Sequence, residues 1–443
     1  MKWVRLLFLL LFSALYSQSH FQLMGGKSKV VIPFQHINNL IFIPVTVNGV
    51  ELTFLLDSGV NETLLFSLEN KEVDFNQVEK MRFSGLGDKV QIEGLLAVNN
   101  RLEIGENLVD RGHMLYLILN EDFNFSSHVG IPVNGIIGYQ FFKDHVVKID
   151  YTRKKITLYD PSHPPKLSRR YAHLDLSLEL NKPYVMAGIE QIRKLTDSKM
   201  LIDLGNSDAL WLFPSVIPGF EYNRPNIDDF LGRGFSGDIY GKRSRIHRLV
   251  LAGFELPYPL TAMPDEFSIQ HLNLVPGRKG SIGNETLRRF TLIFNYPEKK
   301  LSLKKNKFFS DPFHFNMSGL DIRHDGMSWG QDLVQVESQK KSYSTTEGDR
   351  VYTAPTAFQY RFVLLPEYSI AGSRPGSPAY MAGLRKGDKI RTINGRKAST
   401  YTLNQILEVL KSQAGRKLTF EIERKGQIHS FFFYLEDPIP YKE

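Results

Sequence analysis

The feature that most constrains this chain is a long internal repeat. The segment G-I-I-G-Y-Q-F-F-K-D-H-V-V-K-I-D-Y-T-R-K-K-I-T-L, residues 135–158, aligns without a gap on G-S-I-G-N-E-T-L-R-R-F-T-L-I-F-N-Y-P-E-K-K-L-S-L, residues 280–303. The motif F-L-L-D-S-G around Asp57 likewise returns as L-I-D-L-G around Asp203, at nearly the same offset (280 − 135 = 145 and 203 − 57 = 146). Because two separate motifs recur in the same order and spacing, we expect two similar lobes.

Period-two alternation of apolar residues dominates both copies. Residues 40–47, the turn Asn48-Gly49 and residues 51–56 predict a strand, a turn and a second strand that ends at Asp57. A glycine-bearing run at 83–94 resembles 234–241, and each is typical of a β-hairpin. We read 135–142 and 280–290 as a glycine turn that opens a short helix, followed by a closing hairpin. The pattern predicts a mostly β protein.

Two matched aspartates at strand ends point to a shared chemistry. A carboxylate buried next to apolar strands is costly unless partners stabilise it, and here each aspartate is the natural partner of the other. If the lobes pack about a twofold axis, Asp57 and Asp203 meet and share one proton. One carboxylate then activates water and the other hydrogen-bonds a substrate carbonyl. We expect Gly59 and Gly205 to allow the close approach and Ser58 to bond across the interface.

These motifs resemble the bilobal aspartic proteases of the pepsin and retropepsin clan. The resemblance rests on F-L-L-D-S-G with I-I-G, repeated as L-I-D-L-G with S-I-G, and covers roughly residues 38–305. It implies two lobes that are closed or partly open β-barrels. It also implies an aspartic endopeptidase that cleaves polypeptides with the Asp57/Asp203 dyad. A flap at 83–94 would cover the dyad, with Ser84, Gly85 and Gly87 as its expected site residues.

One departure from that family keeps a second reading open. The family has Thr or Ser after each catalytic aspartate, whereas this chain has Leu204 in the second copy. The lost hydroxyl belongs to the network that orients the dyad. The alternatives are therefore an active endopeptidase, a peptide-binding pseudoprotease or scaffold, and a structural envelope protein. It is also open that both aspartates only cap turns at a lobe interface.

The last quarter of the chain carries a different motif. The run P-G-S-P-A-x-x-A-G-L-x-x-G-D-x-I-x-x-I-N-G, residues 375–395, resembles bacterial PDZ domains, which have an α+β fold. The resemblance implies capture of an extended peptide at a strand edge. The expected peptide-binding residues are those of a carboxylate loop and the strand edge after it: Leu365, Glu367, Tyr368, Ser369, Ile370 and Ala371. Pro366 removes an amide donor from that loop, so a purely packing or partner-recruiting module is the alternative.

The N-terminus and the composition predict where the protein is located and exclude several kinds of site. Lys2 and Arg5 precede an apolar run at 6–16 and then small and polar residues, which is the layout of a secretory signal peptide. The chain has no cysteine, which excludes disulfides, thiolate metal sites and a cysteine nucleophile. A secreted chain without cysteine fits a bacterial envelope, so we expect export to the periplasm or the extracellular space.

The domain boundaries follow from these motifs. We expect a signal peptide at 1–19, lobes at 20–162 and 163–308, and a PDZ domain at 309–443 with a mobile insertion near 339–350. The twelve histidines show no close ligand spacing, so we expect neither a metal site nor a cofactor. No polybasic block argues for nucleic acid, and no later stretch is long and apolar enough to span a membrane. The expected partners are a polypeptide substrate and a peptide ligand of the PDZ domain, bound by a monomer.

Overall fold

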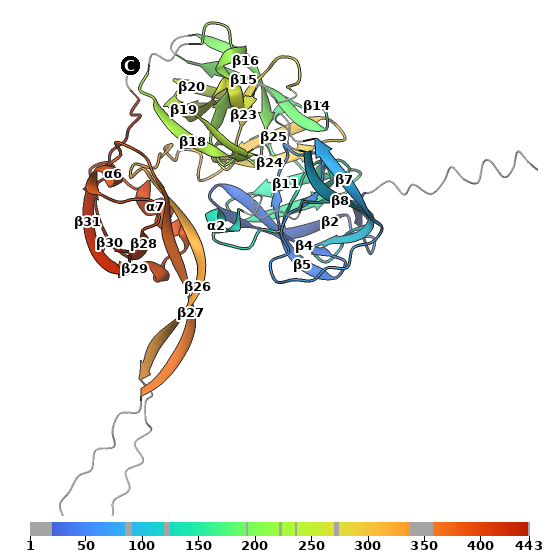
Figure 1. Cartoon of the computed structure of the whole chain (residues 1–443). Helices are drawn as coiled ribbons and strands as arrows, with labels where there is room; N and C mark the ends of the chain where they lie inside the picture. Colours follow the sequence, from blue (N-terminus) through green and yellow to red (C-terminus); the bar gives the residue numbers. More distant parts are fainter. Residues whose placement is uncertain are drawn as a thin grey trace, which may run out of the picture. The chain divides into compact units, whose positions relative to one another are not determined.

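The structure is a computed structural model that describes residues 20–84, 91–118, 125–191, 194–220, 224–234, 237–269, 274–335 and 358–441. The expected signal peptide, Gly85, Gly87 and the insertion near 339–350 lie outside the described residues. The chain divides into two compact units: Met1–Asn316 together with Asp437–Glu443, and Met317–Glu436 (Figure 1). The expected third domain started at 309, and the second compact unit starts at Met317.

The first lobe is a sheet of nine strands in the order β1-β9-β6-β10-β5-β4-β8-β7, with β3 paired to β4. Its strands are β1 (Gln22–Leu23), β3 (Gln35–Ile37), β4 (Leu40–Val47), β5 (Val50–Leu56), β6 (Leu64–Leu65), β7 (Val78–Ser84), β8 (Gln91–Ile104), β9 (Leu108–Leu117) and β10 (Gly135–Ile137). The short helices are α2 (Ser126–Val129) and α3 (Tyr139–Phe142). The predicted hairpin that ends at Asp57 is confirmed by β4 and β5.

The second lobe repeats this plan in ten strands, in the order β18-β19-β22-β17-β23-β16-β15-β20-β21 with β14 paired to β15. They are β14 (Ser177–Glu179), β15 (Lys182–Glu190), β16 (Leu195–Ile202), β17 (Leu210–Leu212), β18 (Ile227–Gly234), β19 (Gly237–Arg245), β20 (Arg248–Leu251), β21 (Phe254–Pro257), β22 (Leu260–Pro264) and β23 (Arg278–Ile282). Its helical segments are η2 (Pro214–Val216), α4 (Glu266–Ile269) and α5 (Asn284–Leu287).

The two lobes share the same central pairing. In the first lobe β10 lies parallel to β5 and antiparallel to β6, and in the second β23 lies parallel to β16 and antiparallel to β17. The prediction that residues 135–137 begin a turn into a helix is therefore wrong. These residues are a strand because they fill the slot between β5 and β6, and the helix starts only at Tyr139.

A third sheet joins the lobes and shows their symmetry. Its strands are β2 (Lys29–Pro33), β11 (Val146–Asp150), β12 (Lys155–Tyr159), β13 (Ala172–Asp175), β24 (Phe290–Asn295) and β25 (Lys300–Lys305), in the order β13-β25-β24-β11-β12-β2. Strands β11 and β24 are repeat copies of each other and pair antiparallel, with Lys148 opposite Ile293. Since Ile293 is the repeat copy of Lys148 (148 + 145 = 293), an approximate twofold axis passes through this pair.

The second unit has its own sheet and core. The sheet order is β26-β27-β28-β30-β31, with β29 paired to β28. Its elements are β26 (Leu320–Gln335), β27 (Phe358–Ser373), α6 (Pro378–Ala382), β28 (Lys389–Ile393), β29 (Arg396–Lys397), η3 (Ala398–Thr400), α7 (Leu403–Leu410), β30 (Lys417–Arg424) and β31 (Gln427–Tyr434). Strands β26 and β27 run on beyond the rest of this sheet as a two-stranded ribbon (Figure 1).

Candidate active site

The two repeated aspartates occupy equivalent places at the end of a central strand. Asp57 follows β5, and its N–H donates to the Ile137 carbonyl at 2.9 Å. Asp203 follows β16, and its N–H donates to the Ile282 carbonyl at 3.0 Å. Both residues are half-buried. The parallel strands β10 and β23 thus fix the direction in which each aspartate leaves its sheet.

The two carboxylates converge on Gly59. A Cβ placed on Gly59 would lie 3.1 Å from Oδ1 of Asp57 and 3.1 Å from Oδ1 of Asp203, so twice that distance is the most that can separate these oxygens. A Cβ on Gly205 would lie only 2.1 Å from Oδ2 of Asp57. Glycine is therefore required at 205, because any side chain there would overlap the carboxylate. Both aspartates therefore lie beside the same glycine, and direct contact of their carboxylates stays a prediction.

Backbone amides hold each carboxylate in its loop. The Gly59 N–H donates to Oδ1 of Asp57 at 2.7 Å, and the Gly205 N–H donates to Oδ1 of Asp203 at 3.2 Å. Burial, followed by the charge of Asp203, raises the pKa of Asp57 to about 7. Burial also raises the pKa of Asp203, opposed by the positive charges of Arg278 and Lys182. The pair therefore keeps a proton well above the pH at which an isolated carboxyl loses it.

The hydroxyl of Ser58 makes two hydrogen bonds to the backbone of the second lobe. Its Oγ donates to the Ile202 carbonyl at 2.7 Å and accepts from the Leu204 N–H at 3.0 Å. Ser58 is fully buried, so these partners take the place of water. Leu204 is also fully buried and packs in the core that the lobes share. Leu204 has no hydroxyl, so it cannot make the bonds to the first lobe that Ser58 makes to the second.

Sequence reasoning missed the residues that hold the second loop. Asn284 donates from Nδ2 to the Leu204 carbonyl at 2.6 Å, and Tyr151 donates from its hydroxyl to Oδ1 of Asn284. Both side chains are buried. Asn284 lies at the start of α5 inside the repeat, whereas Tyr151 is 133 residues away in the first copy. No local pattern could pair residues at that distance.

Arg278 is a second missed residue. It donates from Nη2 to the Ser281 hydroxyl at 2.8 Å and from Nε to the Gly280 carbonyl at 3.2 Å, and its guanidinium stacks on the Phe213 ring at 5.2 Å. Burial lowers the pKa of this guanidinium, although the group stays charged at neutral pH. The structure thus places a fixed cation beside Asp203.

The expected flap is a hairpin whose tip the structure leaves undescribed. Strands β7 and β8 pair antiparallel from Val78 opposite Ala97 to Ser84 opposite Gln91. Ser84 is the last residue of β7, and Gly85 and Gly87 lie outside the described residues. The second lobe carries the corresponding hairpin, β18 with β19. The hairpin is therefore established, whereas the placing of its tip over the dyad stays a prediction.

The expected carboxylate loop of the PDZ domain is wrong. Leu365, Glu367 and Tyr368 lie within β27, where Leu365 pairs with Ser328 of β26. Ser369 pairs with Arg323 on one side and Lys389 on the other, so β27 has no open edge there. The reason is non-local: the partner strand β26 comes from residues before the insertion, which the local motif does not contain.

Three neighbouring residues of β27 are buried, and Ala371 is half-buried. Tyr368, Ser369 and Ile370 are buried, and the Tyr368 hydroxyl donates to the Tyr401 carbonyl at 2.7 Å. Ala371 continues the same strand. Among the described strands of this sheet, the edges belong to β26 and β31.

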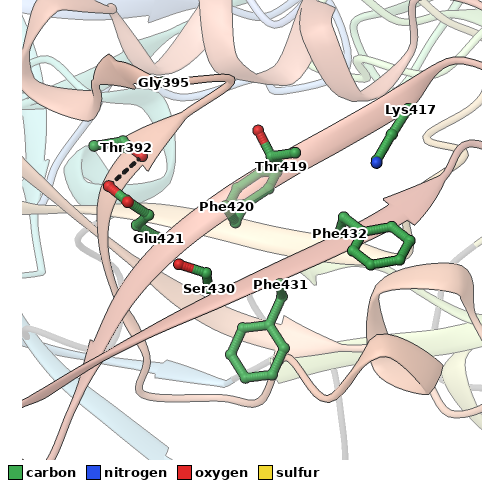
Figure 2. A pocket seen from close by; sticks show the side chains of 9 residues that line it. All are labelled: Thr392, Gly395, Lys417, Thr419, Phe420, Glu421, Ser430, Phe431 and Phe432. Atoms are coloured by element: carbon green, nitrogen blue, oxygen red, sulfur yellow. Dashed lines mark hydrogen bonds between the residues drawn. The ribbon is translucent and has the colours of Figure 1, made fainter.

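A pocket on this sheet lies apart from all the expected site residues (Figure 2). It is lined by residues of β28, β30 and β31 and of the turn at Gly395. Lys417 covers the Phe432 ring at 4.3 Å, and the Thr392 hydroxyl donates to Glu421 at 2.9 Å.

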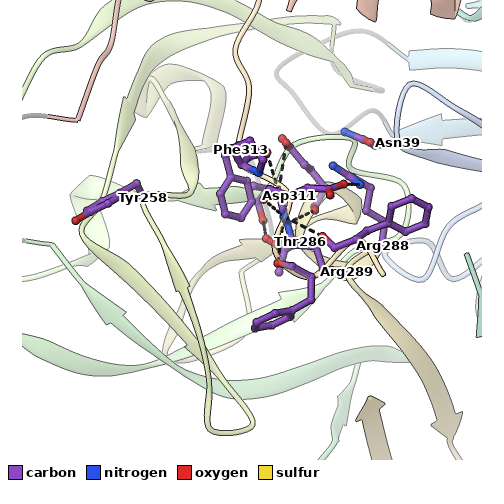
Figure 3. A network of polar contacts seen from close by, with 12 residues as sticks. Asn39, Tyr258, Thr286, Arg288, Arg289, Asp311 and Phe313 are labelled. Carbon is purple, nitrogen blue, oxygen red and sulfur yellow. Dashed lines mark hydrogen bonds and ion pairs between the residues drawn. The ribbon is translucent and has the colours of Figure 1, made fainter. Parts of the chain in front are cut away.

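A buried arginine organises the chain after the second lobe (Figure 3). Arg289 is fully buried and donates to the carbonyls of Glu285, Phe308, Phe309, Asp311 and Pro312. Its guanidinium also stacks on the Phe313 ring at 3.8 Å. The neighbouring Arg288 pairs with Asp311 at 3.0 Å. Residues 308–313 are thereby fastened to the second lobe.

Two further observations concern the whole described part of the chain. No group of three or more His, Asp or Glu side chains in it is arranged to hold a metal ion. No helix in it is long and apolar enough to cross a membrane.

Comparison with protein families matches one segment. Residues 369–424 match the PDZ domain model, which agrees with the sheet and helices of the second unit. Short stretches also resemble curated proteins: 39% identity over 59 residues to a putative zinc metalloprotease of Brucella suis, and 39% over 56 residues to the zinc metalloprotease RasP of Geobacillus kaustophilus. These stretches are 13% of this chain in each case and 15% and 13% of the relatives. The chain therefore spans about one seventh of those relatives.

A search of solved structures returned an aspartic proteinase from Irpex lacteus. The match has 12% sequence identity and a TM-score of 0.44, and it covers 64% of this chain and 99% of the proteinase. A similarity at that level carries no conclusion about this chain. The relationship between the two lobes rests on their own repeat, registers and shared sheet.

Proposed function

We propose that this chain is an aspartic endopeptidase that hydrolyses peptide bonds with water activated by Asp57 and Asp203. The observation that carries the proposal is the meeting of two repeat-related carboxylates at Gly59. Two carboxyls this close do not both ionise readily, which supports a pair that holds an acid and a base at the same pH. Both residues are half-buried and not sealed in the core, which supports access of water and substrate to the pair.

The charges around the pair support one assignment of the proton. Arg278 and Lys182 favour the ionised form of Asp203, while the pKa of Asp57 is raised to about 7. We assign the shared proton to Asp57, whose carboxyl donates a hydrogen bond to the substrate carbonyl. Asp203 takes a proton from water as the water oxygen attacks the carbonyl carbon. Transfer of a proton to the amide nitrogen then lets the C–N bond break, giving a carboxylic acid and an amine.

The test of this assignment is the Asp57→Asn variant. An unfolded protein such as casein serves as the probe, and cleavage is followed by mass spectrometry of the new termini. The variant should lose cleavage by at least a thousandfold while it keeps the wild-type circular dichroism spectrum. Equal cleavage by the variant and the wild type would refute the dyad.

A peptide-binding protein without turnover is the second candidate. It is favoured by Leu204, which is fully buried where a hydroxyl would complete the orienting network. If wild type is inert and Leu204→Thr creates cleavage, binding is the native function. If wild type cleaves and Leu204→Thr changes the rate only modestly, the endopeptidase stands.

We further propose that the PDZ unit takes up an extended polypeptide along the open edge of β26. An edge strand offers unpaired backbone donors and acceptors to an added strand. The chain just before β26 is held at the end of α7, because the Met317 N–H donates to the Leu410 carbonyl at 3.1 Å. The His324 N–H faces the open edge, because the neighbouring Arg323 lies opposite Ser369 in the ladder with β27. Loss of peptide binding on His324→Pro in β26, with the fold retained, supports this edge, and unchanged binding refutes it.

The location and assembly of the chain are also proposals. The basic, apolar and polar order of residues 1–19 supports export to the periplasm or the extracellular space. Both aspartates come from a single chain, so a monomer is sufficient for the proposed chemistry. Fractionation of cells that express the full chain, combined with sequencing of the mature N-terminus, tests the export.

A further inference from the structure

Two hairpins related by the repeat flank the dyad. The first joins β3 to β4 through Asn38 and Asn39, and the second joins β14 to β15 through Leu180 and Asn181. All four turn residues have a positive φ, between 49° and 62°. The hairpins therefore have the same turn geometry, and the strands that follow them, β4 and β15, begin at equivalent places.

Each following strand begins two residues beyond its last pair with the strand that leads to a dyad aspartate. Phe42 pairs with Leu55, and continuing that antiparallel register by two residues brings Leu40 opposite Asp57. Tyr184 pairs with Leu201, and the same step brings Lys182 opposite Asp203. Lys182 is close enough for its charge to act on both aspartates, and Leu40 is the corresponding residue of the first lobe.

Each turn is also bonded to the other lobe. Asn39 donates from Nδ2 to the Ser207 carbonyl at 3.0 Å, four residues after Asp203. Asn181 donates from Nδ2 to Oδ1 of Asn61 at 2.9 Å, four residues after Asp57. These reciprocal bonds hold Leu40 and Lys182 at symmetry-related positions on opposite sides of the dyad.

The two sides differ in charge. Lys182 is half-buried and lies opposite Glu179 in the β14–β15 ladder, but Glu179 pairs with Lys199 at 2.5 Å, and no described carboxylate lies within ion-pair distance of Lys182. Its charge and that of Arg278 both act on Asp203, and Lys182 acts on Asp57 as well. Arg278 is already bonded to Ser281 and Gly280. A dyad that holds one proton carries one negative charge, so this side of the site keeps an excess of positive charge.

On the basis of the proposed peptidase function, we infer that Lys182 is a specificity-determining residue that selects substrates with an aspartate or glutamate close to the scissile bond. The acidic residue lies on the side of the bond that faces β15. The symmetry-related position on the other side is Leu40, which suits an apolar residue. A partly exposed ammonium and a substrate carboxylate give a preference of about tenfold over the neutral amide.

The test starts from a peptide library derived from a whole proteome. Bonds cleaved by the wild type are identified by mass spectrometry, and one is rebuilt as paired peptides with Glu or Gln at each of three positions on either side. The wild type should show a Glu-over-Gln ratio in kcat/KM of about ten at one position. Lys182→Met should bring the ratio close to one, Lys182→Glu should invert it, and Lys182→Arg should keep it. Leu40→Met is the matched control and should leave the ratio unchanged.

Several outcomes would overturn the inference. One is a wild type that shows no position with a preference for Glu. Another is a Lys182→Met variant that keeps the preference, or that only shifts the pH profile equally for both peptides. Affinities of the same peptides with a reduced scissile bond, measured by calorimetry on the wild type and Lys182→Met, separate this inference from the peptidase proposal. Glu-selective binding that needs Lys182, without any cleavage, would refute the peptidase and retain the inference.

Discussion

Replacement of Asp57 by asparagine should stabilise the two-lobed unit at neutral and alkaline pH while it removes the proposed activity. The amide has the shape of the protonated carboxyl and carries no charge. Asp57 lies against Gly59 and Gly205 beside a second carboxylate, where burial raises its pKa from 3.8 to about 7. A raised carboxyl pKa means that the folded state opposes ionisation, so the wild type loses stability as the pH rises.

The size of the stabilisation and the pH range in which it appears follow from that pKa shift. The rise is about 3 pKa units, and each unit corresponds to about 1.4 kcal/mol, so the upper bound is about 4 kcal/mol. Sharing of the proton with Asp203 reduces this figure, and we expect about 2–4 kcal/mol above pH 7. Below pH 4 the group is protonated in both the folded and the unfolded state, so the variant has no advantage there. For a unit of this size the gain corresponds to a rise in Tm of about 4–8 °C.

Scanning calorimetry of the full chain between pH 4 and pH 8.5 measures the effect. The difference in Tm between Asp57→Asn and the wild type should be near zero at pH 4 and reach its plateau above pH 7. Asp197→Asn, at an exposed position of β16, is the matched control and should show no such trend. A difference that does not vary with pH, or a variant less stable than the wild type at pH 8, would refute the reasoning.

Four further predictions follow from the same contacts. The kcat/KM for peptide cleavage should fall as the pH rises through about 7, where Asp57 loses its proton, and a rate that is constant to pH 9 contradicts this. Ser58→Ala removes two buried hydrogen bonds and should cost about 1–3 kcal/mol in denaturant unfolding and at least tenfold in cleavage, with Ser58→Thr retaining more of both. Gly205→Ala should abolish cleavage because its Cβ would overlap Asp57, and normal activity in a folded variant contradicts the geometry. Arg289→Met leaves several buried carbonyls without a hydrogen-bond donor and should lower the free energy of unfolding by about 3–5 kcal/mol. The exposed control Arg396→Met should change the free energy of unfolding little.

The repeat explains how much of the fold was visible in the sequence. Alternation predicted β4 and β5, and the offset between the copies predicted that Asp57 and Asp203 occupy equivalent strand ends. Both patterns are short-range and occur in both copies of the repeat, so a wrong assignment in one copy would disagree with the pattern in the other. The placement of the two carboxylates follows from that duplication and from the glycines at 59 and 205, which permit the approach.

The missed features depend on partners that are distant in the chain. Tyr151 holds Asn284, and Asn181 holds Asn61, across 133 and 120 residues. Strand β26 pairs with β27 along its whole length and thereby turned the expected carboxylate loop into part of a strand. Nothing within ten residues of any of these side chains indicates its partner. Their roles come from packing of the lobes and of the sheet, which a linear motif does not contain.

The buried Leu204 has to be weighed against the other anchors of its loop. Ser58 still bonds the backbone on both sides of Asp203, at Ile202 and Leu204, so the first lobe fixes the second loop without help from residue 204. Asn284, itself held by Tyr151, binds the Leu204 carbonyl from the other side. The Leu204 side chain packs in the shared core, which leaves the backbone to present Asp203. Three hydrogen bonds from two lobes therefore position this loop, and a missing hydroxyl at 204 is compatible with a dyad held in place.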